Sequence, residues 1–239
     1  MRSRATRRAL CLCMLVVGLM GLGAGSAQGS QWMVKGANLK EGVLPEVKIK
    51  ILHKQWIFRV VGIDVKVLCT VSILIGAHLK IFLPTASFLG KLKDTGCTIT
   101  LTTKKELEEG KGGKVSAACE PTHLGEKGVI ETKEFEGPLT LVSGEGALVL
   151  APKSGETLAV IETGEECAIG EEIPIIGKFA LKDSGGLKGL ETEAKVHTFE
   201  EGPGTELWAI SKTAEHAAAI QGKSELELAS GEVWSGLAE

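Results

Sequence analysis

The chain has no tyrosine, and aromatic residues make up only 4% of its 239 positions. Aspartate is also scarce, occurring at Asp64, Asp94 and Asp183, so the clustered carboxylates of a calcium-binding loop are missing. A shortage of aromatic rings weakens any expectation of an extended stacking platform. These shortages exclude several binding classes before any pattern is considered.

Arginine is nearly absent beyond the N-terminal segment. Arg59 is the one arginine after residue 27, beside 22 lysines, so two-point recognition of phosphate by guanidinium groups is not expected. Four of the 27 basic residues lie within the first 27 positions, which leaves 23 basic against 30 acidic residues in the remainder. Because nucleic-acid binding depends on neutralising phosphates, this balance argues against a nucleic-acid partner.

Sequence motifs for catalysis are missing as well. The chain has no Gly-x-Ser-x-Gly, and Gly222-Lys223-Ser224 resembles the end of a P-loop but has Ala217 where the first glycine belongs. The sequence therefore predicts no catalytic residue and no cofactor, and indicates that the protein is not an enzyme.

Histidines occur singly, without the spacing of a metal site. They are His53, His78, His123, His197 and His216. If residues 191–197 were extended, His197, Glu193 and Glu191 would share one face and could bind a metal. A solvated polar strand face is the favoured interpretation, because glutamate is usually exposed. We therefore predict no metal site.

The N-terminus has the three parts of a secretory signal peptide. Four arginines precede an uncharged apolar run over 10–22, and small residues over 23–27 suit cleavage after Ala27. An uncleaved anchor is the alternative, but a membrane span needs about 20 apolar residues. We predict a signal helix over 1–27, a secreted or extracytoplasmic mature chain, and no transmembrane domain after cleavage.

Four cysteines lie beyond this segment, at Cys69, Cys97, Cys119 and Cys167. An even number in an exported protein predicts disulfides, for which three pairings are possible. Cys69–Cys97 with Cys119–Cys167 is favoured, because sequential pairing joins neighbouring strands. The spacing contains no Cys-x-x-Cys, which argues against zinc or a redox pair.

Period-2 alternation and β-branched runs dominate the rest of the chain. Val47-Lys48-Ile49-Lys50-Ile51 alternates cleanly, and a charged, Gly-rich stretch over 103–114 predicts an exposed hairpin loop. Lys212–Gln221 is ambiguous, and the strand interpretation is favoured over a helix. The predicted strands are 47–51, 55–61, 63–71, 73–83, 97–102, 128–133, 138–142, 147–150, 157–161, 173–181, 194–199, 206–211, 214–221 and 224–229.

Many short strands separated by Gly-rich turns predict an all-β fold, an antiparallel β-barrel or β-sandwich. No low-complexity linker divides the chain, so we expect a single β-rich domain over 28–239. Trp32, Trp56, Trp208 and Trp234 could form a sugar-stacking platform, but core or rim packing is favoured. Trp234 is expected to clamp the C-terminal end onto the rest of the domain.

Several short motifs follow a recognisable order. They are Gln31-Trp32, Cys69, Thr95-Gly96-Cys97, Gly128-Val129-Ile130-Glu131-Thr132, Glu166-Cys167 with Gly177, and Ser230-Gly231-Glu232-Val233-Trp234. This layout resembles a family of uncharacterised secreted actinobacterial proteins. The resemblance covers most of the mature chain and implies export, but it supplies no activity and no catalytic residues.

Taken together, these features favour a disulfide-stabilised, non-catalytic binding or structural protein of the extracellular space or cell envelope. One alternative is a barrel-type carrier of a small apolar ligand. Another is a glycan hydrolase that uses two of its 27 glutamates, although no pair is distinguished by an apolar setting.

Overall fold

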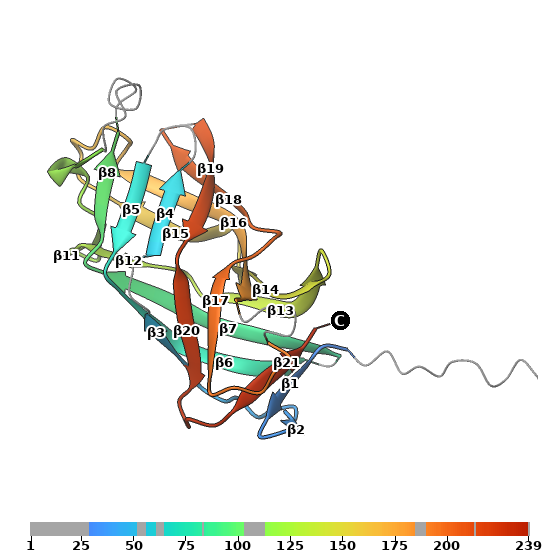
Figure 1. Ribbon diagram of the computed structural model, residues 1–239. Helices are drawn as coiled ribbons and strands as arrows, with labels where there is room; N and C mark the ends of the chain where they lie inside the picture. Colours follow the sequence, from blue (N-terminus) through green and yellow to red (C-terminus); the bar gives the residue numbers. More distant parts are fainter. Residues whose placement is uncertain are drawn as a thin grey trace, which may run out of the picture.

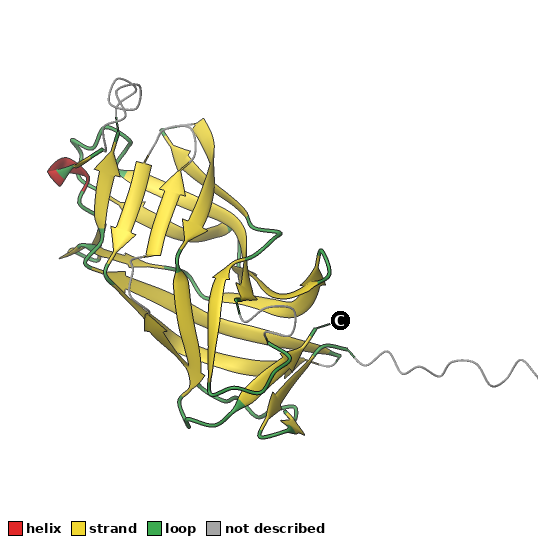
Figure 2. Ribbon diagram, viewed as in Figure 1, coloured by secondary structure: helices red, strands yellow, loops and turns green. Residues whose placement is uncertain are grey.

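Antiparallel strands curl around a shared interior in the computed structural model, forming a half-barrel of many short strands (Figures 1 and 2). The structure describes residues 29–51, 56–60, 65–82, 84–102, 113–184, 190–212 and 214–238. The predicted all-β, antiparallel fold is confirmed. The predicted signal helix and nearly all of the predicted 103–114 loop lie outside the described residues.

The described elements are strands joined by turns, with one 3-10 turn, η1 (Ala117–Cys119). The strands are β1 (Gln31–Val34), β2 (Ala37–Asn38), β3 (Val47–Ile51), β4 (Trp56–Val60), β5 (Val65–Cys69), β6 (Val71–Phe82), β7 (Thr85–Thr95), β8 (Thr98–Leu101), β9 (Lys114–Val115), β10 (Thr122–His123), β11 (Glu126–Lys127), β12 (Val129–Glu131), β13 (Phe135–Val142), β14 (Glu145–Pro152), β15 (Thr157–Glu162), β16 (Glu172–Asp183), β17 (Val196–Glu201), β18 (Glu206–Ser211), β19 (Ala214–Gln221), β20 (Lys223–Leu228) and β21 (Trp234–Leu237).

Both local and distant pairings build the curl. Hairpins such as β4–β5, β6–β7, β13–β14 and β18–β19 join strands adjacent in sequence. The long-range pairs β3–β20 and β4–β19 join the early and late strands of the chain, and β7–β13 joins two hairpins in its middle. In Figure 1 the long β6 and β7 cross the base, and β4, β5 and β8 stand above them. No helix in the described part of the chain has the length and apolar character to cross a membrane.

A bulge in β6 decides which of its side chains face inward. The register with β7 shifts between Ile75 and His78. Before the shift Leu74 faces the interior, and after it Leu79 does. Gly76 lies in the bulge with φ +57°, a conformation that costs a residue with a Cβ about 1–2 kcal/mol. The bulge thus turns Ala77, Leu79 and Ile81 inward after it, whereas Val71, Ile73 and Ile75 before it are exposed.

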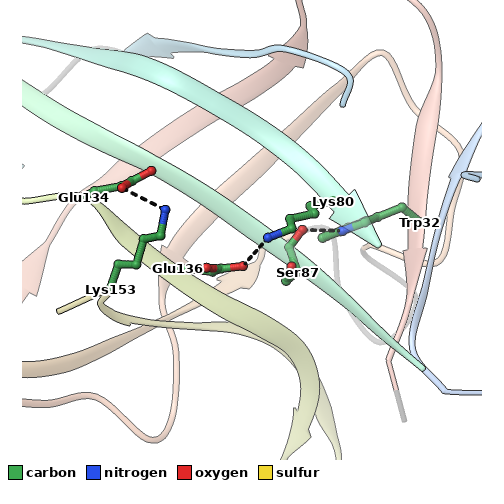
Figure 3. Close-up of polar contacts among 6 residues, drawn as sticks. All are labelled: Trp32, Lys80, Ser87, Glu134, Glu136 and Lys153. Carbon is green, nitrogen blue, oxygen red and sulfur yellow. Dashed lines mark hydrogen bonds and ion pairs between the residues drawn. The ribbon is translucent and has the colours of Figure 1, made fainter. Parts of the chain in front are cut away.

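A small sheet of β1, β2 and β21 brings Trp32 and Trp234 together. Both indoles are fully buried, with ring centroids 5.8 Å apart. The Nε1 of Trp32 donates to the backbone oxygen of Ser87 in β7 at 2.8 Å (Figure 3). Trp234 also stacks on Phe199 of β17, with ring centroids 6.4 Å apart, so its ring holds the C-terminal strand against the main sheet as expected.

The outer face of β7 and its neighbours carries cross-strand ion pairs. Lys80 of β6 bonds Glu136 of β13 at 3.1 Å, and Lys153 bonds Glu134 at 3.1 Å (Figure 3). Such exposed pairs contribute at most about 1 kcal/mol each. They add charged groups to a side of the sheet on which Val71, Ile73 and Ile75 of β6 are also exposed.

One disulfide ties β5 to the turn between β7 and β8, and a second ties η1 to the loop between β15 and β16. Cys69 bonds Cys97, and Cys119 bonds Cys167, the sequential pairs that were favoured because they would join neighbouring strands. All four of these cysteines are buried. Two disulfides in an all-β domain are consistent with a stable extracellular domain, because such bonds persist in oxidising compartments.

Most predicted strands are present, with ends that differ by a few residues. Lys212–Gln221 contains a strand, β19, and no helix. The largest difference is β7 (Thr85–Thr95), which the pattern analysis did not predict and which pairs with β6 on one side and with β12 and β13 on the other. The strands β1 and β21 were not predicted either.

Candidate functional site

An apolar cavity of about 110 Å³ lies inside the curled sheet. A cavity of about 150 Å³ lined by Leu, Ile and Phe is known to bind benzene, so this space is of the size that a small hydrocarbon occupies. Its walls are Ile49, Phe58, Val67, Cys69, Leu74, Phe88, Leu92, Asp94, Ile130, Thr132, Phe135, Leu148, Leu150, Leu158, Ala159, Ile161, Ile175, Phe179, Leu181, Ile220, Ser224 and Leu226.

Strand alternation places these side chains, since every second residue faces the same side of a sheet. On β7, Phe88 and Leu92 face the cavity, and on β16 Ile175 and Phe179 do so. Phe135 of β13 meets Phe179 edge-on, with ring centroids 5.6 Å apart. The cavity is thus built from strands far apart in sequence and exists only when the sheet has curled.

Asp94 is the one ionisable residue among the described residues that line the cavity. It lies directly opposite Ser72 in the β6–β7 register, and the hydroxyl of Ser72 donates to its Oδ1. Burial raises the pKa of the Asp94 carboxyl to about 6, and the Ser72 hydrogen bond opposes that rise in part. An ionised Asp94 at neutral pH is therefore a partly desolvated negative charge at the wall of an apolar cavity.

The hydroxyl groups of the other polar lining residues are less available to hydrogen-bond a ligand. Thr132 Oγ1 accepts the backbone N–H of Leu92 at 2.8 Å, so its oxygen already serves the sheet. Ser224 is almost completely buried in β20. Asp94 is consequently the polar group best placed to orient a molecule in the cavity.

His197 forms a second buried polar centre, close to the Trp32–Trp234 contact. Its Nδ1 is 2.5 Å from Oδ2 of Asp183, and its Nε2 is 2.8 Å from the backbone oxygen of Trp234. The Trp234 ring lies edge-on, 4.4 Å between centroids. Because both ring nitrogens are already bonded inside the core, this imidazole links β16, β17 and β21 and offers no nitrogen to a metal or substrate.

The shared face considered for His197, Glu193 and Glu191 is therefore wrong. β17 begins at Val196, so both glutamates precede the strand, and both are exposed while His197 is buried. Across the described ranges, no group of three or more His, Cys, Asp or Glu side chains is arranged to hold a metal ion.

The remaining histidines are dispersed. His78 Nδ1 is 3.2 Å from the backbone oxygen of Leu44, and His123 Nε2 is 3.9 Å from Glu131. His216 lies on β19, which pairs with β18, and His53 falls outside the described residues. The structure does not bring these side chains together.

Tryptophans divide between the core and one outer groove. Trp32 and Trp234 are buried, and the Trp56 side chain lies outside the described part. Trp208 is 43% exposed and borders a shallow groove of about 390 Å³ with Glu156, Lys178 and Glu206. Lys178 and Glu206 form an ion pair at 3.2 Å. Core packing thus holds for two tryptophans but not for Trp208.

Sequence reasoning missed both Asp94 and the cavity. Asp94 was singled out only as one of three aspartates, because the strand that carries it was not predicted. Its rarity in a glutamate-rich chain is the signal that could have directed attention to it.

Comparison with protein-family models, with curated proteins and with solved structures finds no match. The resemblance based on short motifs consequently assigns no role to any residue.

Proposed function

We propose that this protein is a non-catalytic, extracytoplasmic carrier of a small apolar molecule, which it holds inside the curled sheet. The observation that supports the proposal is the apolar cavity of about 110 Å³. Its lining side chains are hydrocarbon except for those of Cys69, Asp94, Thr132 and Ser224. Ligand sites are commonly concave, mostly apolar and furnished with a few polar groups, and Asp94 supplies such a group here.

Export supports a carrier role on independent grounds. The N-terminal sequence has the features of a signal peptide, and two buried disulfides suit an oxidising compartment. A secreted or envelope-associated carrier would shield an apolar molecule from water, because burial of apolar surface is favourable by about 25 cal/mol per Å².

The test is to purify the protein without detergent, extract it with an organic solvent and analyse the extract by mass spectrometry. We expect one apolar species in stoichiometric amount, or, from protein stripped of ligand, saturable binding of toluene. An extract without such a species, together with no toluene binding, would contradict the proposal.

A filled cavity provides the matched control. Ala159→Leu adds hydrocarbon to the cavity wall, whereas Ala217→Leu makes the same change at an exposed position of β19. Binding should be lost in Ala159→Leu and kept in Ala217→Leu. Equal binding by both variants would place the ligand elsewhere.

A glutamate-based glycan hydrolase is the second candidate, and the groove at Trp208 is the observation that favours it. Glu156 and Glu206 border this groove beside an exposed indole on which a sugar ring could stack. Turnover of a chromogenic glycan panel, abolished by Glu156→Gln or Glu206→Gln and unaffected by the exposed Glu172→Gln, would favour the hydrolase over the carrier.

A further inference from the structure

Asp94 gives one part of the apolar cavity a negative charge. The Asp94 side chain is partly buried: its Oδ1 accepts the Ser72 hydroxyl, and its Oδ2 receives no donor from the residues that the structure describes. A partly buried carboxylate loses some of its hydration, a loss that a charged or hydrogen-bonding partner offsets. The cavity therefore contains a hydrogen-bond acceptor that a ligand could satisfy.

The groups around Asp94 leave its charge unbalanced. Its cross-strand partners are Ser72 on β6 and Ile130 on β12, neither of which is charged. The adjacent Lys93 projects to the opposite face of β7, where it bonds Glu126 at 3.0 Å. On β12, Glu131 likewise faces away from the cavity, 3.7 Å from Lys91.

No cation among the described lining residues neutralises Asp94. The chain as a whole carries a formal charge of −3, which favours the approach of a cation over that of an anion. Resting on the carrier function proposed above, we infer that the ligand is a small apolar amine. Its ammonium group pairs with the Asp94 carboxylate, and its hydrocarbon part occupies the remainder of the cavity.

Protons compete with such a ligand for the same carboxylate. Because burial raises the pKa of Asp94 to about 6, the carboxyl is ionised at pH 7.5 and largely protonated at pH 5. Amine affinity should consequently rise with pH through this range, while the affinity of an uncharged hydrocarbon should stay constant.

Four probes of matched size test the inference: benzylamine, benzyl alcohol, toluene and benzoate, titrated calorimetrically into ligand-stripped full chain. At pH 7.5 benzylamine should bind at least about tenfold more tightly than toluene, and benzoate more weakly than toluene. At pH 5 the affinity for benzylamine should fall about tenfold, since only about one carboxyl in ten is then ionised. The affinity for toluene should not change.

Variants separate charge from shape. Asp94→Asn keeps the size of the side chain and should abolish the preference for benzylamine and its pH dependence while preserving toluene binding. Ser72→Ala should keep the preference, because the carboxylate remains. If Asp94→Asn does not fold, the selectivity and pH profile of the unmodified chain decide the question.

The two proposals fail in different ways. Equal affinity for toluene and benzylamine, or a preference that does not depend on pH, would overturn the amine inference and leave the carrier function standing. Absence of binding by all four probes would overturn both.

Discussion

The Asp94 carboxyl makes the stability of the fold depend on pH. Its pKa rises from 3.8 to about 6 on folding, so the folded state binds a proton more tightly than the unfolded state. This contribution is fully present below pH 3.8 and is lost as the pH rises through 6. The sign is opposite to that of a salt-bridged aspartate, whose contribution is lost on acidification.

Replacement of Asp94 by Asn should therefore raise the free energy of unfolding most at high pH. We expect the unfolding free energy of Asp94→Asn, relative to the unmodified chain, to increase by up to about 3 kcal/mol between pH 3.5 and pH 7.5. Urea unfolding across this range measures the difference. The exposed Glu172→Gln should give a nearly constant difference, and a constant difference for Asp94→Asn would contradict the account.

His197 is the second residue with a large expected effect. His197→Ala leaves Asp183 buried without its imidazole partner, which should cost about 3–5 kcal/mol of unfolding free energy at neutral pH. His123→Ala removes a surface contact at 3.9 Å and should cost under about 1 kcal/mol. A similar loss for both variants, measured by urea unfolding, would show that the buried pair does not link β16, β17 and β21.

At the scale of the strand, two glycines set the course of long elements. Gly76 has φ +57° with open space around the position of a Cβ, whereas Gly177 has φ +103° and a Cβ there would lie 2.1 Å from the backbone oxygen of Glu206. Gly76→Ala should cost about 1–2 kcal/mol through backbone strain alone. Gly177→Ala should cost more, because β16 and β18 must also separate.

Chemical denaturation of the two alanine variants checks this order. Gly76→Asn is the control, since asparagine tolerates the left-handed region better than alanine. The explanation of the bulge fails if Gly76→Asn is as destabilised as Gly76→Ala, or if Gly177→Ala is the more stable of the two alanine variants.

Element prediction from the sequence succeeds where alternation is strong and fails where pairing supplies the stability. Val47–Ile51 alternates clearly and Glu206–Ser211 is a short apolar run, and both are strands with the predicted bounds. β7 contains Gly90, two lysines and an aspartate, so its pattern is weak. It is extended because it pairs with strands on both sides, information that local sequence does not contain.

The cavity could be predicted even less well. Alternation indicates which residues face inward, but a void arises from the fit of side chains contributed by many strands. Asp94 was not predicted as a lining residue because β7 was not predicted as a strand. The position of Asp94 directly across from Ser72 depends on the β6–β7 register and on the bulge within it.

At the scale of the whole molecule, the disulfides reduce the conformational entropy of the unfolded chain. They close segments with sequence separations of 28 and 48 residues, for which chain entropy gives about 3.5–4 kcal/mol each. The double variant Cys119→Ser with Cys167→Ser should lose about 4 kcal/mol yet still bind toluene, because neither residue lines the cavity. Unfolding and toluene titration of this variant test both statements, and lost binding in a folded variant would contradict the second.

The central claim is that the curled sheet binds a small apolar molecule in its interior, and methyl-resolved NMR during a toluene titration tests it most directly. We predict saturable shifts for cavity methyl groups such as those of Leu92, Leu148 and Ile175, and none for the exposed Ile73 and Leu124. Shifts confined to the exposed methyl groups, or no saturable shift in the cavity, would contradict the account.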